Sequence, residues 1–167
     1  MIFNKRIIVA IATAIAASFT LSASAAGLDL QVDSRKLKKR LEETGSRDLD
    51  SYEAKRIFKD YRENEVAADG KYKGKWFVVT GKVSEISKDF RDKPYLVFAM
   101  DGYGMSNVRA DLFEDQVCGA SKEKGVTSCP ATERAAKLKK GQSLDLECKG
   151  GGMVVKMPIL RECLISD

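Results

Sequence analysis

The sequence predicts a small, mainly β protein, a five-stranded Greek-key barrel preceded by one or two α-helices. Three features lead to this prediction: a removable N-terminal segment, an even number of cysteines, and the order of the predicted elements. Three strands, a connection with a short helix, and two more strands follow the leading helices. A three-stranded meander, a crossover and a final hairpin are the order of the OB-fold, a small, partly open barrel.

Residues 1–25 have the pattern of a secretory signal peptide. Two basic residues precede an uncharged apolar run, 7–21, and small residues follow it. The run is shorter than the ~20 residues that span a bilayer, and small side chains suit signal peptidase. We expect cleavage after Ala25, or else after Ala26, and a periplasmic or secreted protein without a transmembrane segment. An uncleaved membrane anchor is the alternative.

Two regions are expected after the signal peptide, an N-terminal helical segment over 26–48 and an OB-fold domain with its leading helix over 49–167. Within the first region, residues 33–44 have the composition of a short charged helix. Its two leucines, four residues apart, give it a narrow apolar stripe, which indicates a peripheral helix. The formal net charge falls from +5 to +3 when the signal peptide leaves, so a polyanion-binding surface is not indicated.

A second helix is predicted from Asp50 to Asp69. Asp50 is a suitable N-cap, and Glu53 stands three residues later, as in a capping box. Asn64 and Glu65 are unusual polar residues near the end of this helix and form a candidate polar junction with the barrel. Hydrogen bonding of these side chains to the backbone is the interpretation that we favour, because polar residues near element ends often satisfy backbone groups.

The strands are recognised by a change to a period of two. We expect them over 75–86, 95–100, 107–113, 143–149 and 153–165. Phe77, Val79 and Val83 share one face of the first strand, and Gly81 marks a bend in it. Residues 150–152, all glycine, are expected to form the turn between the last two strands.

Four cysteines lie after the signal peptide, and they are Cys118, Cys129, Cys148 and Cys163. An even count in an exported chain favours disulfides, of which three pairings are possible. We favour Cys118–Cys129 and Cys148–Cys163. The first bond would close a polar loop within the 114–140 connection, which cannot fold by burial, and the second would join the arms of the final hairpin. Zinc is disfavoured because the chain has no C-x-x-C and no histidine.

Two stretches carry a resemblance, residues 61–89 and 140–163. The first contains Tyr-x-x-Asn-Glu, then Ala-Asp, Tyr-Lys-Gly-Lys and Val-x-Gly-x-Val; the second opens with Lys-Gly-Gln and holds the late cysteine pair. They resemble the tRNA_anti-like family of exported OB-fold proteins over most of residues 50–165. The 114–139 connection and Glu147, where a small residue is expected, depart from its pattern. The family name implies nucleic-acid binding through fold similarity alone, and the resemblance supplies no catalytic residues.

Catalysis is not expected. The chain lacks histidine, the commonest general base, and has no G-x-S-x-G or P-loop motif. We therefore predict a protein that is not an enzyme and has no metal and no cofactor. The cysteine spacings also differ from the C-x-x-C of redox-active dithiols.

A ligand face is predicted on the outer side of the first three strands and a nearby loop, because OB-folds often bind there. Its candidates are Lys82, Tyr95, Tyr103, Arg109 and Phe113. Aromatic and basic side chains could hold single-stranded nucleic acid, a sugar, a peptide or a partner protein. A merely amphipathic outer face is the alternative.

We predict a binding module for a protein or cell-envelope ligand. A single-strand nucleic-acid binder is the first alternative, which export and the modest charge disfavour. An inhibitor or immunity protein of an envelope enzyme is the second. The sequence does not favour a particular ligand.

Overall fold

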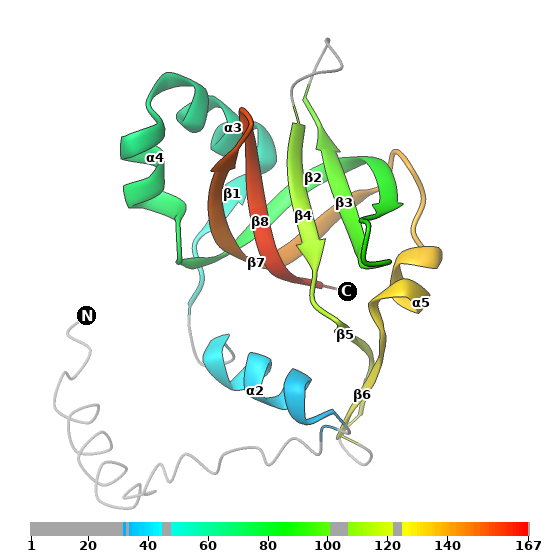
Figure 1. Cartoon of the computed structure of the whole chain (residues 1–167). Helices are drawn as coiled ribbons and strands as arrows, with labels where there is room; N and C mark the ends of the chain where they lie inside the picture. Colours follow the sequence, from blue (N-terminus) through cyan, green and yellow to red (C-terminus); the bar gives the residue numbers. More distant parts are fainter. Residues whose placement is uncertain (1–31, 33, 45–47, 101–106, 122–124, 167) are drawn as a thin grey trace, which may run out of the picture. The chain divides into compact units, whose positions relative to one another are not determined.

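Five strands close into a barrel in which every strand has two neighbours (Figure 1). The computed structural model describes residues 32, 34–44, 48–100, 107–121 and 125–166. The barrel strands are β2 Trp76–Lys88, β3 Pro94–Ala99, β4 Asn107–Leu112, β7 Ser143–Val154 and β8 Met157–Ile165. They follow one another as β2-β3-β4-β8-β7 and back to β2. Only β4 and β8 are parallel among these pairs, so the chain has the predicted OB-fold.

Alternating side chains fill the barrel, as the period of two predicts. Phe77, Val79 and Val83 of β2 are each at most 1% exposed, and they meet buried residues from the four other strands. Gly81 lies where the Phe98 ring crosses β2: a Cβ there would stand 2.5 Å from that ring. The predicted inward face of the first strand is therefore confirmed, and Gly81 is required by close packing.

The predicted single helix from Asp50 to Asp69 is wrong. The chain instead forms the short strand β1 Ser51–Glu53, parallel to β2, then α3 Ala54–Glu63 and α4 Glu65–Tyr72. Asn64 separates the two helices with an extended backbone, and its side chain accepts a hydrogen bond from the Ala67 amide at 3.1 Å. An asparagine side chain that bonds nearby backbone competes with continued helix, so Asn64 ends one helix and caps the next. Asp50 precedes a strand and caps no helix.

The 114–130 connection is not the predicted polar loop. It forms a hairpin of β5 Asp115–Ser121 and β6 Gly125–Pro130, and α5 Ala131–Ala136 follows. The hairpin is stabilised by its own ladder and by burial of Val126, which is 6% exposed. The short helix predicted within this connection is confirmed. Its Ala131 and Ala135 enter the main core.

Residues 150–152 were predicted to form the turn between the last two strands, but they continue β7. The turn lies five residues beyond Gly150, at Val155 and Lys156, between the paired Val154 and Met157. Gly150 is required because β7 passes against the end of α4: a Cβ there would stand 2.1 Å from the Tyr72 carbonyl oxygen. Close backbone approach, and not reversal of direction, explains this glycine.

Both disulfides have the predicted pairing. Cys118 and Cys129 join β5 to β6 with their Cα atoms 5.8 Å apart, and Cys148 and Cys163 join β7 to β8 at 4.2 Å. The second bond lies at a register shift between β7 and β8. Each bond restricts the unfolded chain and so stabilises the fold.

Helix α2 Arg35–Thr44, within the predicted 26–48 segment, packs against the barrel and the β5–β6 hairpin (Figure 1). Leu37 is fully buried with Val126 and Leu164 in a second apolar cluster. Ser34 accepts a hydrogen bond from the Leu37 amide at 3.2 Å and caps the helix. This helix is therefore more deeply buried than the predicted peripheral helix.

The predicted signal peptide, residues 1–25, lies outside the described residues. In the parts of the chain that the structure describes, no helix is both long and apolar enough to cross a membrane.

Candidate functional site

A row of polar and aromatic side chains crosses the outer surface of all five barrel strands. We call it the outer band, and it consists of Tyr95, Arg109, Asp111, Arg161, Lys149 and Trp76. Strand register brings these residues together. Tyr95 lies opposite Asp111, Lys149 lies opposite both Arg161 and Trp76, and a register shift places Asp111 beside Arg161. The band therefore joins residues up to 85 positions apart in sequence.

Arg109 is the most constrained side chain of the band. Its guanidinium carbon lies 4.0 Å from the centre of the Tyr95 ring, and its Nε is 2.6 Å from a carboxylate oxygen of Asp111. A planar guanidinium stacks on an aromatic face and also bonds a carboxylate, which a lysine ammonium cannot do with the same geometry. The three side chains thus present a preformed, partly exposed surface that combines a ring, a cation and an anion.

Arg161 and Lys149 bring two positive charges together in the middle of the band. They are cross-strand partners, and like charges in this position repel. The Arg161 side chain lies over Gly151, where a Cβ would stand 3.0 Å from its Nε. Among the described residues, no carboxylate forms an ion pair with either cation. A ligand with an acidic or hydrogen-bond-accepting group would therefore find two donors here.

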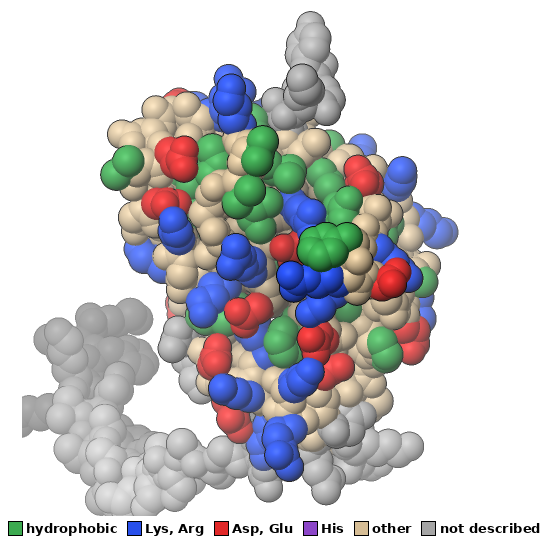
Figure 2. Space-filling model, in the orientation of Figure 1, with side chains coloured by type: hydrophobic (Ala, Val, Ile, Leu, Met, Phe, Trp, Pro, Cys, Tyr) green, Lys and Arg blue, Asp and Glu red, His purple; other side chains and the backbone are tan. Residues whose placement is uncertain are grey.

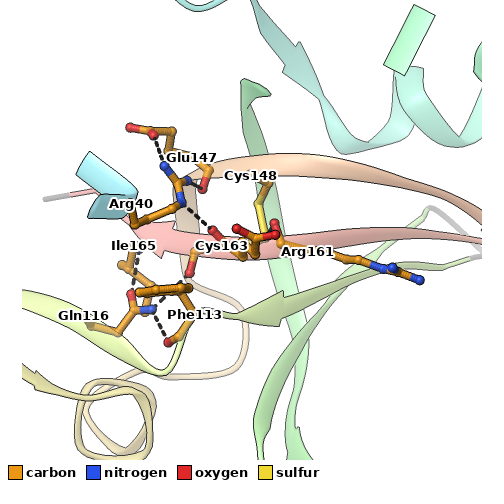
Figure 3. Close-up of a disulfide and its surroundings, with 9 residues drawn as sticks. Arg40, Phe113, Gln116, Glu147, Cys148, Arg161, Cys163 and Ile165 are labelled. Atoms are coloured by element: carbon orange, nitrogen blue, oxygen red, sulfur yellow. Dashed lines mark hydrogen bonds and ion pairs between the residues drawn. A yellow bond between two sulfur atoms is a disulfide. The ribbon is translucent and has the colours of Figure 1, made fainter. Parts of the chain in front are cut away.

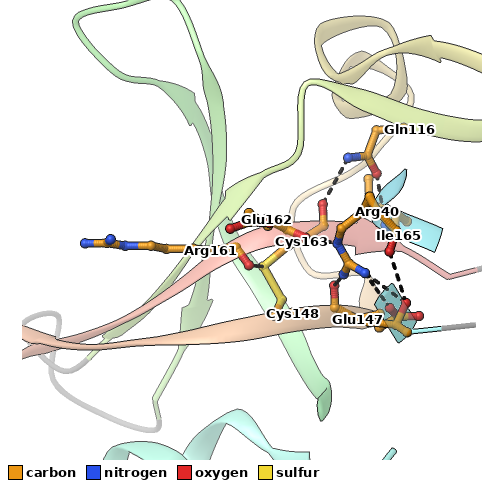
Figure 4. Close-up of polar contacts among 9 residues, drawn as sticks. Arg40, Gln116, Glu147, Cys148, Arg161, Glu162, Cys163 and Ile165 are labelled. Atoms are coloured by element: carbon orange, nitrogen blue, oxygen red, sulfur yellow. Dashed lines mark hydrogen bonds and ion pairs between the residues drawn. A yellow bond between two sulfur atoms is a disulfide. The ribbon is translucent and has the colours of Figure 1, made fainter. Parts of the chain in front are cut away.

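The Trp76 end of the band is held by Arg40 of α2. The Arg40 guanidinium carbon lies 3.6 Å from the centre of the Trp76 ring. Its Nη1 donates to Glu147 at 2.8 Å and to Thr44 at 2.9 Å, Nη2 donates to the Glu147 carbonyl, and Nε donates to the Glu162 carbonyl (Figures 3 and 4). Burial lowers the pKa of Arg40, and the bond with Glu147 opposes that shift. Arg40 thus has a structural role beside the band.

Figures 3 and 4 show that Arg40 and Arg161 lie on opposite sides of the Cys148–Cys163 disulfide. Arg161 extends away from the Cys148–Cys163 disulfide, on the side opposite Arg40. Gln116, which is fully buried, donates to the Cys163 carbonyl at 3.0 Å and accepts from the Ile165 amide at 2.9 Å. These bonds fix the β5–β6 hairpin to the end of β8. Helix α2 and the hairpin therefore cover the Trp76 end of the outer surface and leave the rest of the band partly exposed.

An exposed aromatic loop adjoins the other end of the band. The β2–β3 loop presents Phe90, which is 90% exposed, with the Arg91 guanidinium 5.0 Å from its ring centre. Asp89 accepts hydrogen bonds from the Lys93 and Arg91 amides, and these bonds lower the pKa of its carboxyl. The loop leads directly into β3, where Tyr95 belongs to the band. It could therefore extend a binding surface beyond the strands.

Residues 1–164 match the tRNA_anti-like family. The chain belongs to that family. The match extends the resemblance of residues 61–89 and 140–163 to nearly all of this tRNA_anti-like chain. None of the curated proteins matches its sequence.

Two solved structures resemble the fold of this tRNA_anti-like protein. One is described as a putative nucleic acid-binding lipoprotein from Klebsiella pneumoniae, with 14% identity over 75% of this chain and 97% of that one and a TM-score of 0.49. The other is described as a putative aspartyl-tRNA synthetase from Leishmania major, with 8% identity over 78% of this chain and 25% of that one and a TM-score of 0.39.

The predicted ligand-face residues do not all lie together in the tRNA_anti-like chain. Tyr95 and Arg109 stack on each other within the band. Phe113 instead packs beside the apolar cluster under α2. Lys82 lies in β2 opposite Ser143 and lines a separate open groove of about 230 Å³. Tyr103 lies outside the described residues.

The two residues of the predicted polar junction, Asn64 and Glu65, also have different roles in the structure. Asn64 caps α4 through the Ala67 amide, whereas Glu65 is an exposed residue of its first turn. Glu65 also suits the positive end of that helix. A ligand-binding role of the pair stays a prediction.

Sequence reasoning missed Trp76, Lys149 and Arg161 as members of the band. Lys149 and Arg161 lie on the last two strands, outside the expected ligand face, whereas Trp76 lies on the first strand but was not among its candidates. The alternation of the buried Leu160 with Arg161 would have placed Arg161 outward, but the neighbouring register shift cannot be recognised in the sequence. No group of three or more metal-ligating side chains occurs among the described residues.

Proposed function

We propose that this tRNA_anti-like protein is an extracytoplasmic binding module, without catalytic activity, that engages a protein or cell-envelope ligand through the outer band. The observation that carries the proposal is the Arg109 guanidinium held between Tyr95 and Asp111 at the exposed side of the barrel. A stack of this kind costs little conformational entropy on binding, because its side chains are already ordered.

The two disulfides support the extracytoplasmic location. Disulfides persist in oxidising compartments and are rare in the cytosol. Cys118–Cys129 and Cys148–Cys163 use all four cysteines of the chain, which argues against metal or redox chemistry at these thiols. The signal-peptide pattern of residues 1–25 points to the same location.

The charge of the band favours a mixed polar ligand over a polyanion. Arg109 is already paired with Asp111, so Arg161 and Lys149, whose ammonium lies 5.2 Å from the centre of the Trp76 ring, are the cations that could meet an acidic group of a ligand. Aromatic and arginine side chains are typical anchors of protein interfaces, and a rim of mixed charge sets orientation. Nucleic-acid binding would need more phosphate contacts than two cations supply.

Affinity capture with matched baits tests the proposal. The exported protein, a Tyr95→Ala/Arg161→Glu variant and a Val66→Asn control would each be incubated with periplasmic extract and solubilised envelope. Val66 is 84% exposed on α4 and lies outside the band. We expect the wild type and the control to enrich the same component and the double variant to lose it. Equal enrichment by all three baits would contradict a role of the band.

Titration with a single-stranded oligonucleotide tests the alternative. The proposal predicts weak binding that does not depend on Tyr95 or Arg161. Tight binding with a steep salt dependence, lost in the Tyr95→Ala/Arg161→Glu variant, would instead establish a nucleic-acid binder.

A further inference from the structure

The turn between β7 and β8 has an unusual backbone for its residues. Val155 and Lys156 have φ values of +48° and +62°, and they connect the paired Val154 and Met157. A two-residue turn with both central residues in the left-handed region normally contains asparagine, aspartate or glycine. A β-branched residue is strongly disfavoured there, because its side chain crowds the backbone. The turn is therefore strained at Val155.

Burial does not compensate for this strain. Val155 is 93% exposed and Val154 is 49% exposed, although both are aliphatic. An exposed valine in a strained conformation lowers the stability of the hairpin and adds no packing within the chain. Departures of this kind from local preference are expected at functional sites, where the side chain acts on something outside the fold.

The charge of the hairpin indicates what its apolar end would meet. Residues 150–160 contain one cation, Lys156 at the turn, and no acidic residue, and Lys149 and Arg161 of the outer band add positive charge at the base of the hairpin. Asp69 lies near Gly152 but forms an ion pair with Lys73 at 2.8 Å. Figure 2 shows hydrophobic side chains gathered over the β7–β8 end of this face, with Lys and Arg side chains beside them.

We propose that this hairpin end, Met153 to Met157, docks the protein on an anionic lipid bilayer. Val154 and Val155 would enter the interface while Lys156 contacts lipid phosphate groups. Binding of this type grows with the buried apolar area and with attraction to anionic lipids. A two-residue turn presents its side chains on a convex surface, which suits insertion into a lipid interface. The alternative is insertion of the hairpin end into an apolar groove of a partner protein. This inference goes beyond the proposed ligand, since the outer band would remain free to bind.

Co-sedimentation with vesicles tests the docking. The exported full chain would be mixed with vesicles of equal parts phosphatidylglycerol and phosphatidylcholine, or with phosphatidylcholine alone, at low and high salt. We expect binding to the anionic vesicles only, weakened by salt. Val155→Asn should lower the partition coefficient about tenfold, since burying one valine is worth roughly that factor. The control Val66→Asn removes a valine of α4 that is 84% exposed and should leave binding unchanged.

Two further measurements keep the result interpretable. Val155→Asn should melt at or above the wild-type temperature, because asparagine tolerates a positive φ, so its loss of binding would not reflect unfolding. Tyr95→Ala should bind the vesicles like the wild type, which separates this inference from the function of the band. Absence of binding to anionic vesicles at low salt, or unchanged binding of Val155→Asn, would overturn the proposal. Loss of a captured protein from Val155→Asn, with no vesicle binding by the wild type, would instead assign the hairpin end to a protein groove.

Discussion

Replacing Arg40 by methionine removes the charged contacts that hold α2 on the barrel and keeps an apolar stem of similar length. The Arg40 side chain is 1% exposed, and its guanidinium makes four hydrogen bonds and stacks on Trp76. Removal of one member of a buried ion pair costs about 3–5 kcal/mol. Glu147 is 23% exposed and can gain some water, which reduces the penalty. We therefore expect a loss of about 2–4 kcal/mol in the free energy of unfolding.

Urea denaturation of the exported protein would measure this loss. Lys39→Met changes an exposed neighbour in the same helix and should stay within about 0.5 kcal/mol of the wild type. The double variant Arg40→Met/Glu147→Leu should recover part of the loss, because it leaves no unpaired carboxylate. A cost below about 1 kcal/mol for Arg40→Met, or an equal cost for Lys39→Met, would refute the view that α2 is anchored by Arg40.

Three further predictions concern the fold. Gly150→Ala should destabilise by roughly 3 kcal/mol, because its Cβ would meet the Tyr72 carbonyl oxygen, and an unchanged urea midpoint would show that the backbones can separate. Phe77→Ala should cost about 3–5 kcal/mol in the same assay, and a cost below about 1 kcal/mol would mean that this side chain does not fill the core. Burial raises the pKa of the Asp60 carboxyl, but hydrogen bonds from Lys71 and Tyr72 outweigh burial and hold that pKa below its usual value. Asp60 should therefore contribute stability above its unfolded pKa and lose that contribution as pH falls through the lower folded pKa. The difference in unfolding free energy between wild type and Asp60→Asn should shrink between neutral pH and about pH 3. A difference that stays constant over this range would contradict the linkage.

The cysteine pairing shows what local sequence can predict. Cys148 and Cys163 lie on the last two strands of the chain, and consecutive strands of a hairpin are neighbours, so their bond follows from the order of the strands. The inward set of Phe77, Val79 and Val83 follows from the same period of two. Predictions of this kind succeed because they depend on residues close in sequence.

The helix from Asp50 to Asp69 shows where such reasoning ends. Its apolar spacing and its capping box are helical, yet residues 51–53 pair with β2 and Asn64 interrupts the remainder. Pairing with β2 overrides the helical preference of these three residues, and no local pattern shows that this strand is adjacent. Gly150 was misassigned to a turn for a related reason, because glycine is needed there where Tyr72 approaches β7.

The sequence by itself determined the strands of the barrel, the inward faces of most of them, the disulfide pairs and the family. Only the tertiary structure decided the outer band and the burial of Arg40. The band joins Tyr95, Arg161 and Trp76 through the register of five strands, and a single-residue shift at a bulge changes which side chain faces outward. The register of the strands depends on contacts across the whole closed barrel, so it cannot be predicted from any single segment of the sequence.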